Sequence, residues 1–290
     1  MRIHVLSDLH REHPFDFPKL PVELGEIDAD FIVMAGDINN AFRLSLPHEV
    51  HEKTGLPVIH ISGNHELYNR DRVPVSEIHE ELRRRAGGSD GVWFLENDFI
   101  DLPARNGGLV RFIGATLWTD WNFFQQPDVS MKAARIGMSD YRHIWVTGDD
   151  GRPRLLTPDD TLLWHQESRS FIESILAEPF DGRTVVVTHH AANEVGMRNP
   201  WELEKHSRGL QPAYGSDLSA IMEADNAPDF WISGHTHISC DVEHGNTRII
   251  SNAQGYFDPQ LKRPENREFN AGLIVNLGDC PRMKRQEFVP

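Results

Sequence analysis

Acidic, amide and imidazole side chains are grouped in five short blocks along this 290-residue chain. Carboxylate, amide and imidazole donors without cysteine suit divalent ions such as Mn, Fe, Zn or Mg rather than soft metals. Their types and grouping therefore indicate chemistry with divalent metals. The blocks are Asp8-Leu9-His10, Gly36-Asp37, Gly63-Asn64-His65-Glu66, His189-His190 and Gly234-His235-Thr236-His237.

A short apolar run rich in β-branched or aromatic residues precedes each block, and such runs predict β-strands because they are too short for helices. Ligands of open α/β sheets bind outside the carboxyl ends of the strands, so distant blocks can meet there. The sequence therefore predicts one shared site. The predicted strands cover residues 3–6, 31–35, 58–61, 184–187 and 230–232.

The histidine pairs differ in what their spacing predicts. In an extended segment alternate side chains point the same way, so His235 and His237 can reach one cluster. His189 and His190 would point to opposite faces of a strand, so at most one of them enters the site, and we expect His189. Gly36-Asp37 taken alone is also ordinary turn chemistry, and the five blocks together are far more specific than any one of them.

The order D-x-H, G-D, G-N-H-E, H and G-H-x-H, from Asp8 to His237, resembles the calcineurin-like metallophosphoesterase superfamily. The resemblance implies an α/β/β/α sandwich, in which two mixed β-sheets pack face to face with helices outside. It also implies two divalent metal ions, with Mn expected ahead of Fe, Zn or Mg. In such a site two cations bind the phosphate and lower the pKa of a bridging water, which gives a hydroxide nucleophile.

The family's site residues can be carried over one by one. The resemblance makes Asp37 the bridge between the two metals and His65 the general acid that protonates the leaving oxygen. One metal would be held by Asp8, His10, Asp37 and His237, and the other by Asp37, Asn64, His189 and His235.

The residues directly after Gly36-Asp37 narrow the substrate class. The chain continues Ile38-Asn39-Asn40-Ala41 and lacks the Asp-Arg pair of the superfamily's protein phosphatases, which disfavours a phosphoprotein. Without that arginine fork, a small-molecule or nucleotide phosphodiester is favoured, because a phosphate dianion needs more bidentate binding. The alternatives are a phosphomonoesterase of small phosphorylated metabolites and a non-catalytic binding scaffold, which would be expected to lack ligands or the acid.

The net charge of the chain limits the classes of molecule that it is expected to bind. The formal net charge is −15, and no basic patch of the size that extended nucleic acid needs is visible. Arg83-Arg84-Arg85 follows glutamates at helical spacing, which indicates a solvated, ion-paired helix face. A small phosphorylated substrate is compatible with this charge, because bound metals would set the local field.

The chain is predicted to be one domain over residues 1–290, with a cap-like insertion at about 115–160. In that insertion Trp121 or Phe123 would stack on a base and Arg135 or Arg142 would meet a phosphate; the alternative is a satellite hydrophobic cluster. In the loop at 199–216, Lys205 or Arg208 would bind phosphate, or the loop is a mobile surface segment.

The sequence also predicts the compartment of the protein and further elements outside the blocks. We expect a cytoplasmic protein without a membrane partner, because no apolar stretch reaches about 18 residues and a strand starts almost at Met1. Cys240 and Cys280 are expected to stay reduced. Helices are predicted at 130–142, 162–178 and 217–224, a hairpin at 242–251 around Gly245-Asn246, and a last strand at 271–277.

Overall fold

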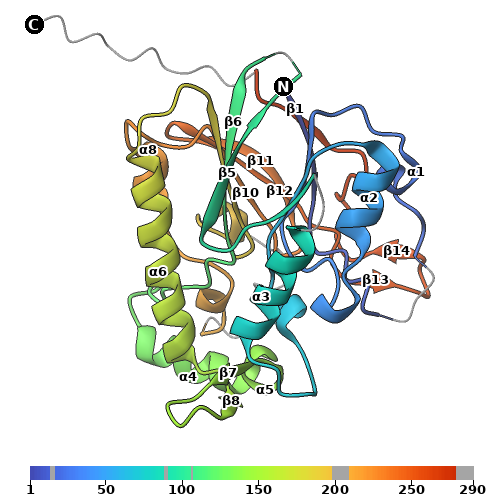
Figure 1. Cartoon of the computed structure of the whole chain (residues 1–290). Coiled ribbons are helices and arrows are strands. Elements are labelled where there is room, and N and C mark those ends of the chain that lie inside the picture. The colour runs from blue at the N-terminus through green and yellow to red at the C-terminus, as the bar shows by residue number, and fades with distance from the viewer. Residues whose placement is uncertain (14–16, 88–90, 106, 198–208, 279–290) are drawn as a thin grey trace, which may run out of the picture.

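The computed structural model describes residues 1–13, 17–87, 91–105, 107–197 and 209–278 (Figure 1). In this part of the chain two β-sheets contain the predicted strands. Both sheets are mixed, and helices cover their outer faces, which confirms the predicted α/β/β/α sandwich.

The first sheet has five strands in the order β15-β1-β2-β3-β4. Strands β1 to β4 run parallel, whereas β15 pairs antiparallel with β1. The strands are β1 (Arg2–Leu6), β2 (Phe31–Met34), β3 (Val58–His60), β4 (Val92–Phe94) and β15 (Ile274–Asn276).

The second sheet has six strands in the order β11-β12-β10-β9-β6-β5. Its four inner strands run parallel, and the edge strands β5 and β11 are antiparallel to their neighbours. The strands are β5 (Asp98–Pro103), β6 (Leu109–Ala115), β9 (Arg183–Thr188), β10 (Phe230–Ser233), β11 (Ser239–His244) and β12 (Thr247–Asn252).

The main core lies between the sheets because the inner strands are apolar on both faces. In β2, Phe31 and Val33 join the cluster between the sheets, while Ile32 and Met34 join the cluster on the helical side. In β9, Val187 faces the other sheet and Val186 packs on the second sheet's helical side. Burial of both faces explains why these strands read as continuous apolar runs.

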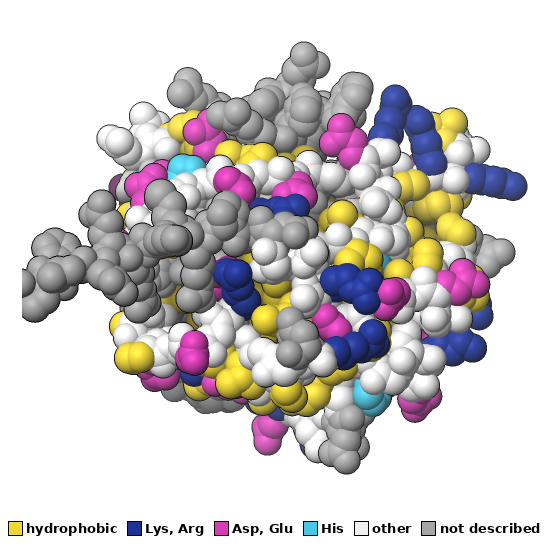
Figure 2. All heavy atoms as spheres, turned by 90° about the horizontal axis from the view of Figure 1, so that it is seen from above, with side chains coloured by type: hydrophobic (Ala, Val, Ile, Leu, Met, Phe, Trp, Pro, Cys, Tyr) yellow, Lys and Arg dark blue, Asp and Glu magenta, His cyan; other side chains and the backbone are white. Residues whose placement is uncertain are grey.

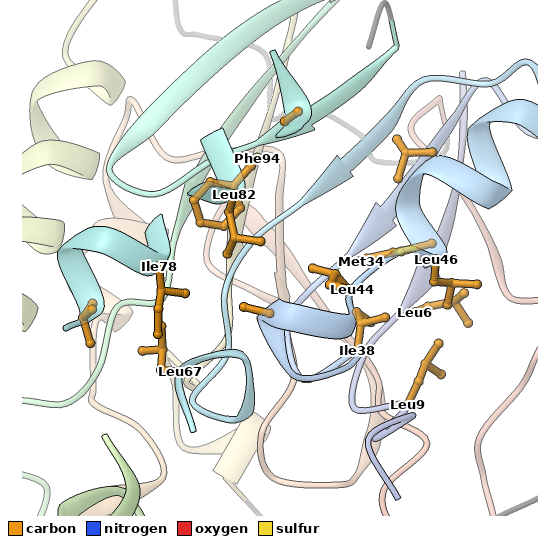
Figure 3. Close-up of a cluster of buried hydrophobic side chains, with 14 of the residues drawn as sticks. Leu6, Leu9, Met34, Ile38, Leu44, Leu46, Leu67, Ile78, Leu82 and Phe94 are labelled. Carbon is orange, nitrogen blue, oxygen red and sulfur yellow. The ribbon is translucent and has the colours of Figure 1, made fainter. Parts of the chain in front are cut away.

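Helices cover the outer face of each sheet (Figure 1). The helix α3 (Val75–Ala86) contributes Ile78 and Leu82 to the cluster on the first sheet's outer side, where Leu82 lies beside Phe94 (Figure 3). The second sheet is covered by α6 (Pro158–Leu176), whose N-cap Thr157 forms a capping box with Asp160. The other helices of these layers are α1 (Pro21–Leu24), α2 (Leu46–Thr54) and α8 (Ser219–Glu223).

The segment between β6 and α6 contains two helices and a small hairpin. The single helix predicted over 130–142 is wrong, because α4 ends at Gly137 and Met138 is extended. Glycine at the end of a helix lowers the cost of leaving the helical conformation. The elements are α4 (Pro127–Gly137), α5 (Asp140–His143), β7 (Trp145–Thr147) and β8 (Pro153–Leu155).

The C-terminal hairpin is confirmed, with Gly245 at a positive φ of 57° in the turn between β11 and β12, whereas the last strand is shorter than the predicted 271–277. A further two-stranded ribbon precedes β15. The remaining elements are β13 (Phe257–Asp258), β14 (Arg263–Pro264), η1 (Ala41–Arg43), η2 (His65–Leu67), η3 (Val195–Met197) and η4 (Gln211–Ala213).

Surface features match the composition. Arg84 and Arg85 both bind Glu81, as the spacing predicted. Positive and negative side chains are intermixed on the face seen in Figure 2. Among the described residues, no helix is long and apolar enough to cross a bilayer. Cys240 is a free thiol, whereas Cys280 lies outside the described residues.

Candidate active site

All eight residues predicted to form the site follow the carboxyl ends of parallel strands, three strands in the first sheet and two in the second. Six of them are buried, and His65 and His237 are partly buried. They are Asp8 and His10 after β1, Asp37 after β2, Asn64 and His65 after β3, His189 after β9, and His235 and His237 after β10.

The backbone at five of these residues is left-handed, which is uncommon for residues other than glycine. Strained backbone of this kind concentrates at functional sites. The extended segment predicted over His235 and His237 is wrong, because both residues have a left-handed backbone; His237 lies in one group of donor atoms and His235 in another. The φ angles are 53° at Asp8, 46° at His10, 54° at Asp37, 66° at His235 and 51° at His237.

Two glycines let the loops approach the acidic residues. A Cβ atom on Gly63 would lie 2.1 Å from Asp37 Oδ1, and one on Gly234 would lie 2.4 Å from Asp8 Oδ2. Both distances are far inside van der Waals contact, so these positions require glycine. The glycines of the motifs therefore serve close packing of the loops around the carboxylates.

The first cluster contains Asp8, His10 and His237, with their ligand atoms within 4.8 Å of one another. The Nε2 atoms of His10 and His237 lie 3.1 Å apart, and His237 Nε2 lies 3.5 Å from Asp8 Oδ1. Three donor atoms thus converge on one point.

The second cluster contains Asp37, His189 and His235, again within 4.8 Å. His189 Nε2 lies 3.3 Å from Asp37 Oδ2 and 3.1 Å from Asn64 Oδ1, so the amide oxygen of Asn64 joins this cluster. Asp37 also lies 3.8 Å from His10 Nε2 of the first cluster. The carboxylate of Asp37 therefore stands between the two clusters.

Three of the site histidines form a hydrogen bond through Nδ1 to an acceptor that lies outside the two clusters. His189 Nδ1 donates to the Ala35 carbonyl at 2.9 Å, and His237 Nδ1 lies 2.7 Å from Glu265 Oε2. His10 Nδ1 is bonded to a carboxylate in the same way. Because these acceptors occupy Nδ1, each Nε2 atom is the one presented to the cluster.

This arrangement fits divalent metal ions. The Nε2 atoms of His10 and His237 face each other, and two such lone pairs repel unless a proton or a cation lies between them. His235 Nε2 is buried and has no hydrogen-bond partner among the described residues. Burial, together with His190 and His189, holds the pKa of His235 well below its usual range, so its ring is neutral and can coordinate.

Asn64 is oriented by a residue of the segment between β6 and α6. Its Nδ2 donates to Asp140 Oδ1 at 2.8 Å and to the Tyr68 hydroxyl at 3.1 Å, while Tyr68 donates to Asp140 at 2.5 Å. With the amide nitrogen held by these acceptors, the amide oxygen points toward His189. Asp140 comes from α5, so the segment between β6 and α6 reaches the candidate site.

Glu66 is buried beneath the loops that carry Asp37 and Asn64. Its carboxylate accepts backbone N–H groups of Asp37 at 2.9 Å, Ile38 at 2.8 Å and Gly63 at 2.8 Å. Burial and the neighbouring Asp37 raise the pKa of Glu66 to about 7. One side chain thus ties two ligand-bearing loops together.

His65 lies beside both clusters. Its backbone N–H donates to Asp37 Oδ1 at 2.8 Å, and its ring Nδ1 lies 2.8 Å from Glu12 Oε1. Burial opposes the imidazolium, but Asp37 and Glu12 outweigh burial and raise the pKa of His65 to about 9. The other ring nitrogen, Nε2, lies 3.4 Å from the Tyr256 hydroxyl. His65 can therefore carry a proton at neutral pH.

The prediction that Trp121 stacks on a base is wrong, and the other residues named in the sequence analysis differ in what the structure shows of them. Trp121 is only 2% exposed and donates its indole N–H to the Pro158 carbonyl, so it belongs to the core and does not present a stacking face. His190 donates to the Thr116 carbonyl and packs on Trp118. Lys205 and Arg208 fall outside the described residues.

The family model described as calcineurin-like phosphoesterase matches residues 1–239 of the chain. The chain belongs to the calcineurin-like phosphoesterase family. Members are metal-dependent phosphoester hydrolases, and this phosphoesterase carries the acidic and imidazole clusters that such chemistry needs. No curated protein matches it in sequence.

Two solved structures resemble the phosphoesterase. The phosphopantetheinyl hydrolase PptH from Mycobacterium tuberculosis has a TM-score of 0.62 and 19% sequence identity, over 89% of this chain and 90% of that chain. A protein assigned as a 5′-nucleotidase from Staphylococcus aureus has a TM-score of 0.44 and 14% identity, over 91% of this chain and 52% of that chain. The first likeness supports the fold.

Several residues that hold the phosphoesterase site are not predicted from the sequence. Glu12 and Glu66 stand within or next to the motif blocks, and their charge so close to candidate ligands is the signal that could have found them. Asp140, Tyr256 and Glu265 are far along the chain from the residues they touch, and no spacing rule connects them.

Proposed function

We propose that this phosphoesterase hydrolyses a phosphodiester of a small molecule or nucleotide. One observation carries the proposal: the carboxylate of Asp37 belongs to one cluster of donor atoms and lies 3.8 Å from His10 of the other, and the His65 backbone N–H bonds to it. Asp37 is the proposed bridge between two divalent ions, with Asp8, His10 and His237 on one side and Asn64, His189 and His235 on the other.

When bound, two divalent ions at such a site supply Lewis acidity and lower the pKa of a coordinated water. Mn is the ion we propose first, because carboxylate and amide oxygens suit it; Fe and Zn, which imidazole suits, are the alternatives together with Mg. The resident residues hold these ligands rigidly: Ala35, Glu12 and Glu265 accept from the Nδ1 atoms, and Asp140 orients the Asn64 amide.

His65 is the proposed general acid. Its Nδ1 is bonded to Glu12, which leaves Nε2 directed outward beside Tyr256. A proton on Nε2 can pass to the oxygen that leaves phosphorus, which matters most for a poor leaving group. Hydrolysis then needs no further acid from the chain.

The charge around the clusters favours a diester. Among the described residues, no lysine or arginine is bonded to any of the eight site residues, and the carboxylates of Glu12, Asp140 and Glu265 surround them. A monoester dianion carries one more negative charge than a diester and gains most from arginine forks. A diester monoanion therefore suits this surrounding better.

The test is a direct comparison of two substrates. The purified protein is stripped of metal, supplied with Mn²⁺, and assayed on bis-p-nitrophenyl phosphate and p-nitrophenyl phosphate. We expect metal-dependent turnover that is faster on the diester. The Asp37→Ala variant, prepared identically, is the control for contaminating phosphatases. Faster turnover of the monoester would contradict the diester proposal and favour the phosphomonoesterase alternative.

A further inference from the structure

Glu12 lies two residues after His10 and contacts both that residue and His65. A single oxygen, Glu12 Oε1, lies 3.0 Å from His10 Nδ1 and 2.8 Å from His65 Nδ1. The two rings stand edge to face with centroids 4.5 Å apart. One carboxylate thus joins a candidate metal ligand to the candidate acid.

The two bonds fix how both rings are used. An ionised carboxylate only accepts hydrogen bonds, so both Nδ1 atoms must be donors. His10 is then left with Nε2 facing His237 and Asp37, and His65 with Nε2 facing the Tyr256 hydroxyl. The ring that should coordinate and the ring that should carry a proton are therefore oriented by the same group.

No other carboxylate can do this for His65 among the residues that the structure describes. Asp37 accepts from the backbone N–H of His65 and not from its ring. Asp140 binds Asn64 and Tyr68 instead. The second oxygen of Glu12 is buried and has no hydrogen-bond partner among the described residues, so the hydrogen bonds of this carboxylate go to the two imidazoles.

We propose that Glu12 is a positioning residue that sets the orientation and tautomer of His10 and His65 together, and so links metal binding to protonation of the leaving group. The proposal rests on the acid role of His65 given above, but it does not depend on whether the substrate is a diester. Its matched comparison is Glu265, which binds Nδ1 of His237 at 2.7 Å and makes no contact with His65.

The experiment uses full-length Glu12→Gln and Glu265→Gln with two readouts. The first is affinity for Mn²⁺ by calorimetry, which should weaken about tenfold in both variants because outer partners of metal-bound histidines have effects of that size. The second is the ratio of turnover on an aryl ester to turnover on an alkyl ester. We expect Glu12→Gln to raise this ratio about tenfold and Glu265→Gln to leave it unchanged.

Ring ¹⁵N chemical shifts give a readout that needs no activity. In the unaltered protein they should show a proton on Nδ1 of both His10 and His65, and Glu12→Gln should change this pattern at both rings. Glu12→Asp, which keeps the charge, should restore part of the ratio. A Glu12→Gln variant with the aryl-to-alkyl ratio and the His65 shifts of the unaltered protein would overturn the proposal.

The substrates are chosen so that failure of the diester proposal can be distinguished from failure of the Glu12 proposal. If p-nitrophenyl phosphate is the better substrate, the ratio is measured with aryl and alkyl monoesters instead. The diester proposal then fails while the Glu12 proposal is still tested. Melting temperatures of the variants measured alongside show that a change in ratio does not come from unfolding.

Discussion

Asn64 Nδ2 donates a hydrogen bond to Asp140 Oδ1 at 2.8 Å, across 76 positions of sequence. The bond joins the loop after β3 to α5, in the segment between β6 and α6. It holds the Asn64 amide so that its oxygen faces His189. A residue outside every metal-ligand motif therefore decides which atom of a motif residue faces the candidate metal centre.

Replacing Asp140 tests this relationship. In Asp140→Ala the Asn64 amide loses one of its two acceptors, and the other, the Tyr68 hydroxyl, loses its own partner, so we expect affinity for the second metal ion to fall about tenfold or more. Calorimetric titration with Mn²⁺ measures it. The control is Asp149→Asn, an exposed acid of the same segment. Unchanged binding of both ions by Asp140→Ala would show that the amide needs no such support.

Replacing Asp37 and replacing His237 should change the number of bound metal ions differently. We expect Asp37→Ala to lose both ions, because its carboxylate stands between the clusters, and His237→Ala to lose one. Elemental analysis of the Mn²⁺-loaded proteins gives the stoichiometry. One ion retained at full affinity by Asp37→Ala would argue against bridging.

His65→Ala should keep its metals and lose acid catalysis. We expect turnover to fall about a hundredfold on an alkyl ester and much less on a nitrophenyl ester, whose leaving group needs no proton. Steady-state rates on the two esters, with metal content measured in parallel, check this. Equal losses on both esters would contradict the general-acid role.

His60 should make the fold sensitive to acid. It is 2% exposed, and burial, with a smaller contribution from His48, lowers its pKa from 6.5 to about 3. The unfolded chain therefore binds a proton between these pH values and the folded chain does not. The free energy of unfolding should fall as pH falls below 6.5, by up to about 1.4 kcal/mol per unit for this residue.

Urea unfolding at pH 7 and pH 4.5, with a chelator present in both, measures this effect. His60→Leu removes the titrating group, so it should lose less stability between the two pH values than the unaltered protein, by about 2 kcal/mol. His244→Leu, at a partly exposed position on the hairpin, is the control. If His60→Leu has the same pH dependence as the unaltered protein, burial of His60 does not contribute to acid lability.

The sequence alone determined the strands and the set of residues at their ends. Apolar runs such as residues 31–35 and 184–187 must be buried on both faces, and parallel strands bring their carboxyl ends to one edge. Asp37 and His189 therefore meet although 152 positions separate them. The apolar pattern of each strand and the direction of the strands are enough to predict this meeting, because both follow from residues close together in the sequence.

Only the tertiary structure decided which atoms of these residues face one another. The left-handed backbone at His235 and His237 is such a detail, and one ring lies in each of the two clusters. The burial of Trp121 and the hydrogen bond from Asn64 to Asp140 depend on how the segment between β6 and α6 packs. Such contacts join residues through space and leave no periodic or spaced pattern in the sequence, so packing alone fixes them.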